Sequence, residues 1–262
     1  MANSVSMSVG KARLNGEYFA APKAPAPAVV LLPGCGGLYA KDKQPAVRYA
    51  RMASQLQELG FAVLMLNPER SITLKNRCQV SNIQQQKKEM KRRANEAQLA
   101  ITWLKARRDI DSNRIAVVGW DNGASAALSL LNRTNPGVRS AVVFYPNCRL
   151  LLGADFRVAA PTILLTGERD TLTPYAQCTE LSRISGQSLF HLVSYPNARH
   201  DFDLMLDHLE DEALNLPKNH LALDVIAESD SAQDAWRRTY KWLSRWFDPE
   251  RSMEGVPPRN LQ

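Results

Sequence analysis

Residues 115–123 read Ile-Ala-Val-Val-Gly-Trp-Asp-Asn-Gly, and an alanine-rich run, residues 124–131, follows them. The apolar residues 115–118 predict a buried strand, and the alanine-rich run predicts a helix. Glycine on either side of the turn lets the strand and the helix approach closely, while the central residue sits at a sharp bend. This pattern is typical of a nucleophile elbow, in which the central residue is usually Ser or Cys. Here it is Asp121, so the chemistry does not follow from the pattern alone.

The chain of 262 residues is long enough for one α/β domain with a full core and short for two. We expect a single domain over residues 1–262, with a core from about residue 15 to 247 and a C-terminal tail at 248–262. No run of about 18 apolar residues occurs, so no membrane-spanning helix is expected. Residues 1–10 lack the charged and apolar regions of a signal peptide. These observations favour a cytoplasmic protein and leave periplasmic or secreted locations open.

Basic residues are in excess, and the formal net charge is +7. The densest basic run is Lys-Lys-Glu-Met-Lys-Arg-Arg at residues 87–93. We interpret this run as the solvated face of a helix, because no nucleic-acid-binding motif and no interleaved aromatic residues accompany it. We therefore expect no nucleic acid and no membrane as partners, and a surface that can attract anionic substrates.

The four cysteines are Cys35, Cys78, Cys148 and Cys178. They form no Cys-x-x-Cys motif, and no histidine spacing suggests zinc, so we expect no metal site. Cys148 and Cys178 each follow a predicted core strand. A disulfide between them is therefore one alternative, and buried or loop thiols are the other.

Strand-like and helix-like segments alternate through most of the chain, which predicts a largely parallel sheet covered by helices on both faces. The expected strands are residues 28–32, 61–66, 115–118, 138–145, 162–165 and 189–194. The expected helices are residues 47–59, 83–108, 124–131, 175–184 and 234–247. Residues 81–84 have the spacing of a capping box before the long helix. The polar residues 69–80 either line the mouth of a pocket or form an exposed loop.

Three polar side chains follow predicted parallel strands, where α/β sheets place their active sites. They are Asp121 at the elbow, Asp170 in Gly-Glu-Arg-Asp and His200 in Asn-Ala-Arg-His-Asp-Phe. Their chain order matches the nucleophile, acid and base of α/β-hydrolases. Of the four histidines, only His200 follows a strand and a turn at the right place. We predict His200 as the base and Asp170 as its acid partner; a structural histidine and a simple turn aspartate are the alternatives.

A glycine-rich loop, Pro-Gly-Cys-Gly-Gly-Leu at residues 33–38, directly follows the first strong strand. Such a loop can turn a backbone N–H toward a developing oxyanion. The second donor would be the N–H of Asn122, the residue after the elbow position. We therefore expect an oxyanion hole between these two segments. Cys35 as the nucleophile is the alternative, although it lacks an elbow.

These motifs, in this order, resemble the dienelactone hydrolase family. The resemblance extends over roughly residues 15–247, and its motifs are Gly-Cys-Gly-Gly-Leu (34–38), Gly-Trp-x-Asn-Gly (119–123), Phe-Tyr-Pro-Asn-Cys (144–148), Gly-Glu-x-Asp-x-x-Thr-Pro (167–174) and Ala-x-His-Asp-Phe (198–202). It implies a single-domain α/β-hydrolase fold without a large cap domain and without a metal or organic cofactor. It also implies a monomer or homodimer that hydrolyses a small ester or lactone.

The resemblance assigns site residues by position. The nucleophile falls at Asp121, the acid at Asp170, the base at His200, and the oxyanion-hole donors at Cys35 and Asn122. The substrate contacts are expected at Gly36, Trp120 and Tyr145. The chain departs from the family pattern at three positions: Asp121 replaces Cys or Ser, Ala124 replaces a common second glycine, and Pro33 stands where many α/β-hydrolases have His.

An aspartate at the elbow changes the expected reaction. Ser or Cys attacks a carbonyl group and forms an acyl-enzyme, whereas Asp121 would form a high-energy mixed anhydride. Aspartate is better suited to a saturated carbon, as in haloalkane dehalogenases and epoxide hydrolases, whose histidine activates the water that opens the alkyl-enzyme ester. Those families usually carry a helical cap, and residues 146–161 are too few for one.

A catalytically inactive binding protein on the same fold is the remaining alternative, and an engineered replacement of the nucleophile would look the same. Asp121 would then occupy the oxyanion hole and pair with protonated His200. Two observations separate the alternatives. A solvent-connected cavity at Asp121, lined by residues 67–80 and 147–157, indicates an enzyme. A carboxylate folded against the N–H of Asn122 indicates a binding protein.

Overall fold

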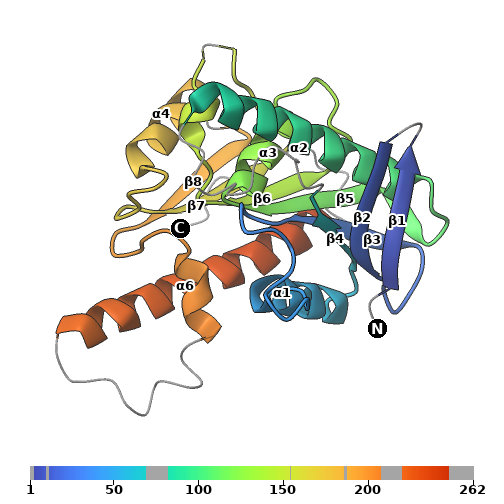
Figure 1. The fold of residues 1–262 in the computed structure, drawn as a ribbon, viewed down its shortest axis with the longest axis horizontal. Coiled ribbons are helices and arrows are strands. Elements are labelled where there is room, and N and C mark those ends of the chain that lie inside the picture. Colours follow the sequence, from blue (N-terminus) through green and yellow to red (C-terminus); the bar gives the residue numbers. More distant parts are fainter. Residues whose placement is uncertain are drawn as a thin grey trace.

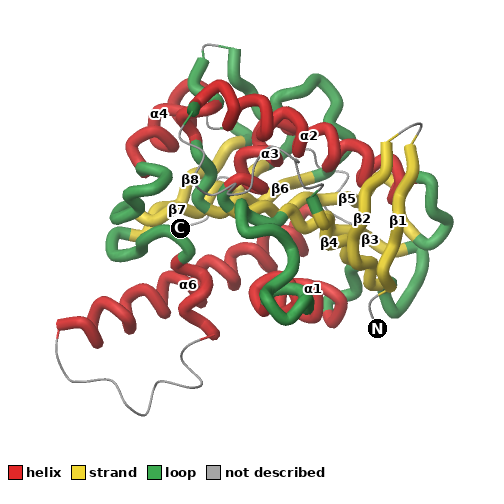
Figure 2. Tube along the Cα trace, in the orientation of Figure 1, coloured by secondary structure: helices red, strands yellow, loops and turns green. Residues whose placement is uncertain are grey.

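The computed structural model describes residues 3–9, 12–68, 82–153, 155–185, 188–207 and 220–247, and its centre is a sheet flanked by helices (Figures 1 and 2). The strands are β1 (Asn3–Val9), β2 (Ala12–Phe19), β3 (Ala26–Leu32), β4 (Ala62–Asn67), β5 (Ile110–Trp120), β6 (Ser140–Phe144), β7 (Thr162–Gly167) and β8 (Phe190–Tyr195). The helices are α1 (Val47–Glu58), α2 (Ile83–Lys105), α3 (Asn122–Leu131), α4 (Tyr175–Ser185) and α6 (His220–Phe247), with the 3-10 helices η2 (Cys148–Leu150) and η3 (Phe202–Asp207). The loop expected at 69–80 and the tail expected at 248–262 lie outside the described residues.

The sheet is mostly parallel, as predicted. Its order is β1-β2-β4-β3-β5-β6-β7-β8, and only β2 pairs antiparallel, with β1 and with β4. Helices α2, α3 and α4 cover one face, and α1 and α6 cover the other (Figure 1). The predicted α/β architecture with helices on both faces is confirmed. No helix in the described ranges is long and apolar enough to cross a membrane.

Besides shifts of up to five residues at the ends of other elements, three predictions about the elements differ from the structure. The hairpin of β1 and β2 is missing from the predicted strands, because its residues alternate between exposed and buried positions instead of forming an apolar run. Helix α6 begins at His220 rather than at Asp234, well before the aromatic stripe used to predict it. The cap of α2 is Asn82, whose side chain accepts the N–H groups of Gln84 and Gln85, so the capping-box interpretation of residues 81–84 is wrong.

Strand β3 shows why the central strands have continuous apolar sequences. Val30 and Leu32 pack into the core beneath α2 and α3, while Val29 and Leu31 pack into the core beside α1 and α6. All four side chains are buried. Because side chains alternate across a strand, a strand covered on both faces needs apolar residues at every position. The apolar cores on the two faces of the sheet hold the strands in place, and thereby the strand ends from which the polar loops begin.

The turn between β5 and α3 depends on two glycines. A Cβ on Gly119 would lie 2.7 Å from the carbonyl carbon of Gly123, and a Cβ on Gly123 would lie 2.0 Å from the carbonyl oxygen of Leu32. Asp121, between the glycines, has φ 49° and ψ −115°, a conformation that costs a non-glycine residue energy. The chain therefore has the strained strand-to-helix turn that the sequence predicts.

We predict that Gly123→Ala lowers the free energy of unfolding by about 3 kcal/mol or more, because the new methyl group has no space against β3. Gly153→Ala is the matched control, since a Cβ there meets nothing within 4 Å and should change stability by less than about 0.5 kcal/mol. Urea unfolding followed by circular dichroism measures both. Equal stabilities of the two variants would contradict the close approach.

Candidate active site

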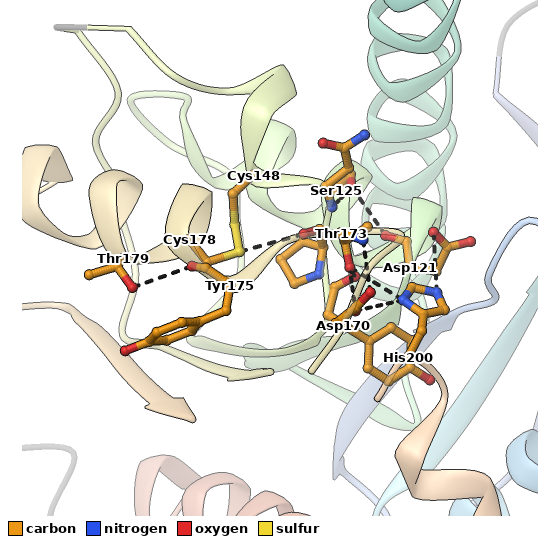
Figure 3. Close-up of a disulfide and its surroundings, with 12 residues drawn as sticks. Asp121, Ser125, Cys148, Asp170, Thr173, Tyr175, Cys178, Thr179 and His200 are labelled. Atoms are coloured by element: carbon orange, nitrogen blue, oxygen red, sulfur yellow. Dashed lines mark hydrogen bonds and ion pairs between the residues drawn. A yellow bond between two sulfur atoms is a disulfide. The ribbon is translucent and has the colours of Figure 1, made fainter. Parts of the chain in front are cut away.

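The three residues predicted to carry the chemistry lie together at the carboxyl ends of parallel strands, the usual position of active sites in α/β sheets. Asp121 follows β5, Asp170 follows β7 and His200 follows β8. Figure 3 shows the His200 ring between the two carboxylates. The fold thus brings together side chains from three segments that are far apart in the sequence.

His200 and Asp170 form a hydrogen-bonded pair. Nδ1 of His200 lies 2.7 Å from Oδ2 of Asp170. Oδ1 of Asp170 accepts the N–H groups of Leu172 and Thr173, each at 2.8 Å. The Thr173 hydroxyl donates to Oδ2 at 2.6 Å. The carboxylate is therefore fixed by its own turn, and it orients the imidazole.

The pKa values of this pair are shifted in opposite directions. Burial alone would raise the pKa of Asp170, but hydrogen bonds from His200 and Thr173 outweigh it and hold the pKa below its usual value. Burial alone would lower the pKa of His200, but the hydrogen bond and the charge of Asp170 overcome it, and the charges of Asp201 and Asp121 add to the increase. His200 is therefore a stronger base than a solvent-exposed histidine.

The side chain of Asp121 occupies the place where an oxyanion hole is expected. The N–H of Cys35 donates to its Oδ2 at 2.9 Å, and the N–H of Asn122 also acts to lower the pKa of the carboxyl. Burial raises the pKa of Asp121 above its usual value, against the opposing effect of these N–H groups, His200 and Arg93. The other oxygen, Oδ1, lies 4.0 Å from Nε2 of His200, which is too long for a hydrogen bond.

A cavity of about 500 Å³ opens beside this carboxylate. Asp121, His200 and Gly36 line it, and so does Asn147 from the wall expected at 147–157. Helix α2 adds Gln86, Glu89, Met90 and Arg93. Within the described ranges, no group of three or more acidic, histidine or cysteine side chains is arranged to hold a metal ion. A cavity is therefore present beside Asp121, with Asn147 from one of the expected walls, while residues 69–80 of the other lie outside the described residues. The carboxylate is bound by the N–H of Cys35, so the structure combines features of both alternatives.

The prediction that Trp120 and Tyr145 contact the substrate is wrong for their side chains. Neither lines the cavity, and both are completely buried. The Trp120 ring stacks on Phe144, and the Tyr145 ring packs against the His200 ring with centroids 4.6 Å apart. Their polar groups both bind Asp203, a buried residue that the motifs did not single out.

Arg93 lines the cavity although its sequence context suggested solvent. It is 4% exposed, and its guanidinium donates to the carbonyl group of Pro33 at the start of the glycine-rich loop. The basic run 87–93 was interpreted as a solvated face, which is wrong for this residue. The signal that identifies it is its spacing, three residues after Met90 and four before Ala97, both buried on the inner face of α2.

Arg48 of α1 also lines the cavity and is buried. Its guanidinium forms ion pairs with Asp201 at 2.8 Å and with Asp203 at 3.1 Å. No local pattern marks this residue, because its partner Asp201 lies 153 residues away in the chain.

Cys148 and Cys178 form a disulfide between the loop after β6 and helix α4 (Figure 3). The pairing proposed as one alternative is therefore confirmed. Cys35 is also disulfide-bonded. Its sulfur is not a thiolate, so the alternative that made Cys35 the nucleophile is wrong. The N–H of Cys35, which contacts Asp121, does not depend on the state of the sulfur.

Replacing both Cys148 and Cys178 with Ser should lower the free energy of unfolding by about 2–4 kcal/mol, because the bond joins residues 30 apart in the sequence. Urea unfolding of the native protein and the double variant measures the difference. Alkylation with iodoacetamide after denaturation without reductant is the second check. Labelling of Cys148 and Cys178 in the native protein under those conditions would contradict the disulfide.

Comparisons with known proteins agree with this fold. The model of the dienelactone hydrolase family matches residues 16–247. A dienelactone hydrolase-like promiscuous phosphotriesterase from metagenomic libraries has a TM-score of 0.66 and 20% identity, covering 93% of this chain and 97% of its own. A dienelactone hydrolase from Anabaena variabilis ATCC 29413 has a TM-score of 0.59 and 21% identity, and the match covers 87% of this chain and 95% of that hydrolase. Esterase 2 of Thermogutta terrifontis has a TM-score of 0.63 and 14% identity, and the match covers 98% of this chain and 97% of that esterase. No curated protein sequence matches the chain.

Proposed function

The chain belongs to the dienelactone hydrolase family and is a hydrolase, and we propose that Asp121, His200 and Asp170 act as its nucleophile, base and acid. We propose further that Asp121 attacks a saturated carbon of a small substrate rather than a carbonyl group. The product of that attack is an alkyl ester of the enzyme, which water then hydrolyses.

The placement of the Asp121 carboxylate supports this reaction. Oδ2 is held by the N–H of Cys35 at 2.9 Å, while Oδ1 lies 4.0 Å from Nε2 of His200 at the wall of the cavity. One oxygen is fixed and the other is left to attack. The fixed oxygen already lies among donors that stabilise negative charge. A carbonyl substrate would need the same donors for its own oxygen, and Asp121 occupies them.

In the first step, Oδ1 of ionised Asp121 forms a bond to the saturated carbon while the bond from that carbon to its leaving group breaks. The leaving group keeps the electron pair. It departs as a halide from an alkyl halide, or as the alkoxide of an opened epoxide, which takes a proton from solvent. Asp121 is then a neutral ester. The cavity of about 500 Å³ suits a small substrate.

In the second step, water adds to Cγ of that ester. Neutral His200 accepts the proton of the water at Nε2, and Asp170 stabilises the resulting imidazolium. The tetrahedral oxyanion is the former Oδ2, bound by the N–H groups of Cys35 and Asn122. Its collapse breaks the bond between Cγ and the alkyl oxygen. The alcohol leaves with the proton from His200, and the carboxylic acid that remains on Asp121 loses its proton through His200 to solvent, which restores the carboxylate.

Hydrolysis of a small ester or lactone is the second candidate. The family match over residues 16–247 and the hydrogen-bonded pair of His200 and Asp170 favour it. Asp121 would have to leave the two N–H groups before a substrate oxygen could bind there. Attack on the carbonyl group would then give a mixed anhydride, which is high in energy. We therefore rank this reaction below attack at a saturated carbon.

The disulfide-bonded cysteines also give information on the cellular compartment of the protein. The bond between Cys148 and Cys178 and the disulfide state of Cys35 are typical of an oxidising compartment. We propose a periplasmic or secreted location in place of the cytoplasmic one expected from residues 1–10.

A single turnover in 18O-labelled water tests the alkyl-enzyme ester, with enzyme in excess over 1-bromobutane or 1,2-epoxybutane. We expect the label in Asp121, detected by the mass of its peptide, because water adds to Cγ while the first alcohol carries the enzyme's own oxygen. Asp121→Asn should lower kcat by about 10⁴-fold or more and remain folded. Label in the alcohol with none in Asp121 would contradict the proposal.

Asp121→Ser should create hydrolysis of short p-nitrophenyl esters, at least about 100-fold above the native protein. Serine is shorter, frees the two N–H groups, and lies where His200 can activate it. The double variant Asp121→Ser/His200→Ala is the control and should lose this activity. Native ester hydrolysis that His200→Ala abolishes would favour the second candidate. An active Ser variant of a native protein that turns over neither the esters nor 1-bromobutane nor 1,2-epoxybutane would indicate a binding protein.

The reaction should require high rather than low pH. The reaction needs ionised Asp121 and neutral His200. Burial raises the pKa of Asp121 above its usual value. Burial acts to lower the pKa of His200, but Asp170 outweighs it and raises that pKa as well. Activity is therefore lost as the pH falls through the raised pKa of His200, above 6.5. Asp170→Asn should lower kcat and move this midpoint to lower pH. A rate that falls as the pH rises from 6 to 8 would contradict the assignment.

A further inference from the structure

Asp203 is a completely buried carboxylate, and it does not line the cavity. The indole Nε1 of Trp120 donates to its Oδ2 at 2.8 Å, and the hydroxyl of Tyr145 donates to its Oδ1 at 2.6 Å. Nε of Arg48 lies 3.1 Å from Oδ2 as an ion pair. A buried carboxylate is costly unless such groups compensate it. An ionised carboxylate only accepts hydrogen bonds, so it suits these two donors and the neighbouring guanidinium charge.

The two donors and the guanidinium come from three segments that the active site depends on. Trp120 ends β5 and directly precedes Asp121, and Tyr145 follows β6. Arg48 belongs to α1 and also pairs with Asp201, next to His200. Asp203 itself is the second residue of η3, the 3-10 helix that follows the His200 turn. One carboxylate therefore connects the elbow, the end of β6 and the segment that carries His200.

Tyr145 contacts both members of the acid–base pair. Its ring packs against the His200 ring with centroids 4.6 Å apart. Its carbonyl oxygen lies 3.2 Å from the hydroxyl of Thr173, the same hydroxyl that binds Asp170 at 2.6 Å. The backbone of Tyr145 has φ 38°, a conformation that needs surrounding contacts to hold it. Its hydroxyl bond to Asp203 is one such contact.

We propose that Asp203 is a positioning residue of this active site, which holds the Tyr145 ring against His200 and thereby fixes the imidazole between Asp170 and Asp121. Neither Asp203 nor Tyr145 touches the cavity, so both act through His200. Burial and the neighbouring charge of Asp203 keep the pKa of Tyr145 well above its usual value, so its hydroxyl remains a donor. The kinetic part of this inference rests on the proposed function, and the structural part does not.

The test compares Tyr145→Phe and Asp203→Asn with the native protein. Tyr145→Phe keeps the ring and removes only the hydroxyl that binds Asp203, while Asp203→Asn keeps the shape and removes the charge. We expect each to lower kcat about 10-fold, because small misplacements of a catalytic group have large effects on rate. KM should be unchanged, since neither side chain lines the cavity. The proton NMR signal of Nδ1–H in His200, bound to Asp170, should shift or broaden in both.

Tyr18→Phe is the matched control. The hydroxyl of Tyr18 also donates to a carboxylate, that of Asp109, at 2.8 Å, and the residue is also buried, but it belongs to β2 and is absent from the cavity lining. Its loss should lower stability without changing kcat or the His200 signal. A merely structural role for the Tyr145 hydroxyl predicts the same result for Tyr145→Phe.

The proposal is overturned if Tyr145→Phe matches Tyr18→Phe in both kcat and the His200 signal. If Asp203→Asn does not fold, Tyr145→Phe still decides the question. If the native protein hydrolyses none of the probes, the proposed function fails, while a changed His200 signal in Tyr145→Phe alone would still support the positioning role. An unchanged signal would reject it independently of any activity.

Discussion

The close contact between Gly123 and the end of β3 determines the geometry of the whole site. A Cβ on Gly123 would lie 2.0 Å from the carbonyl oxygen of Leu32 and 2.5 Å from that of Pro33. Because α3 starts directly against β3, the turn before it lies beside the loop that leaves β3. The N–H of Cys35 can therefore reach Asp121 at 2.9 Å. Arg93 of α2 also donates a hydrogen bond to the Pro33 carbonyl group and holds the start of that loop.

The same backbone can serve two reactions, and the side chain at the elbow decides between them. With a short hydroxyl or thiol at position 121, the two N–H groups are open to a substrate oxygen. With Asp121, a carboxylate oxygen takes that position beside the two N–H groups and accepts a hydrogen bond from that of Cys35. In an alkyl ester of Asp121 they would bind the ester carbonyl oxygen, which becomes the oxyanion when water adds. The occupied hole is therefore consistent with catalysis and does not by itself indicate an inactive protein.

The fold and the three candidate residues Asp121, Asp170 and His200 follow from local sequence signals, whereas the supporting residues do not. Apolar runs such as 115–118 and the paired glycines around Asp121 predict strands and a turn without reference to the rest of the chain. Asp203 has no such signal, because its partners arrive from segments that only the folded sheet brings together. The helical spacing of Arg93 indicates that it is buried, but its positive charge favours the interpretation of a solvent-exposed residue. Trp120 and Tyr145 stand beside the site in sequence, yet their side chains point into the core.

The charges of the site are coupled, and this coupling fits the proposed order of steps. Burial lowers the pKa of His200, and Asp170, Asp201 and Asp121 together raise it. Formation of an alkyl ester removes the charge of Asp121 and one of these three contributions. The pKa of His200 then falls, which favours the neutral imidazole when water has to be deprotonated. Asp170 keeps its charge throughout, because hydrogen bonds from His200 and Thr173 outweigh burial and hold its pKa low. In the proposed mechanism the first step would thus prepare the base for the second, and the pair of Asp121 and His200 has to be treated as one titrating unit.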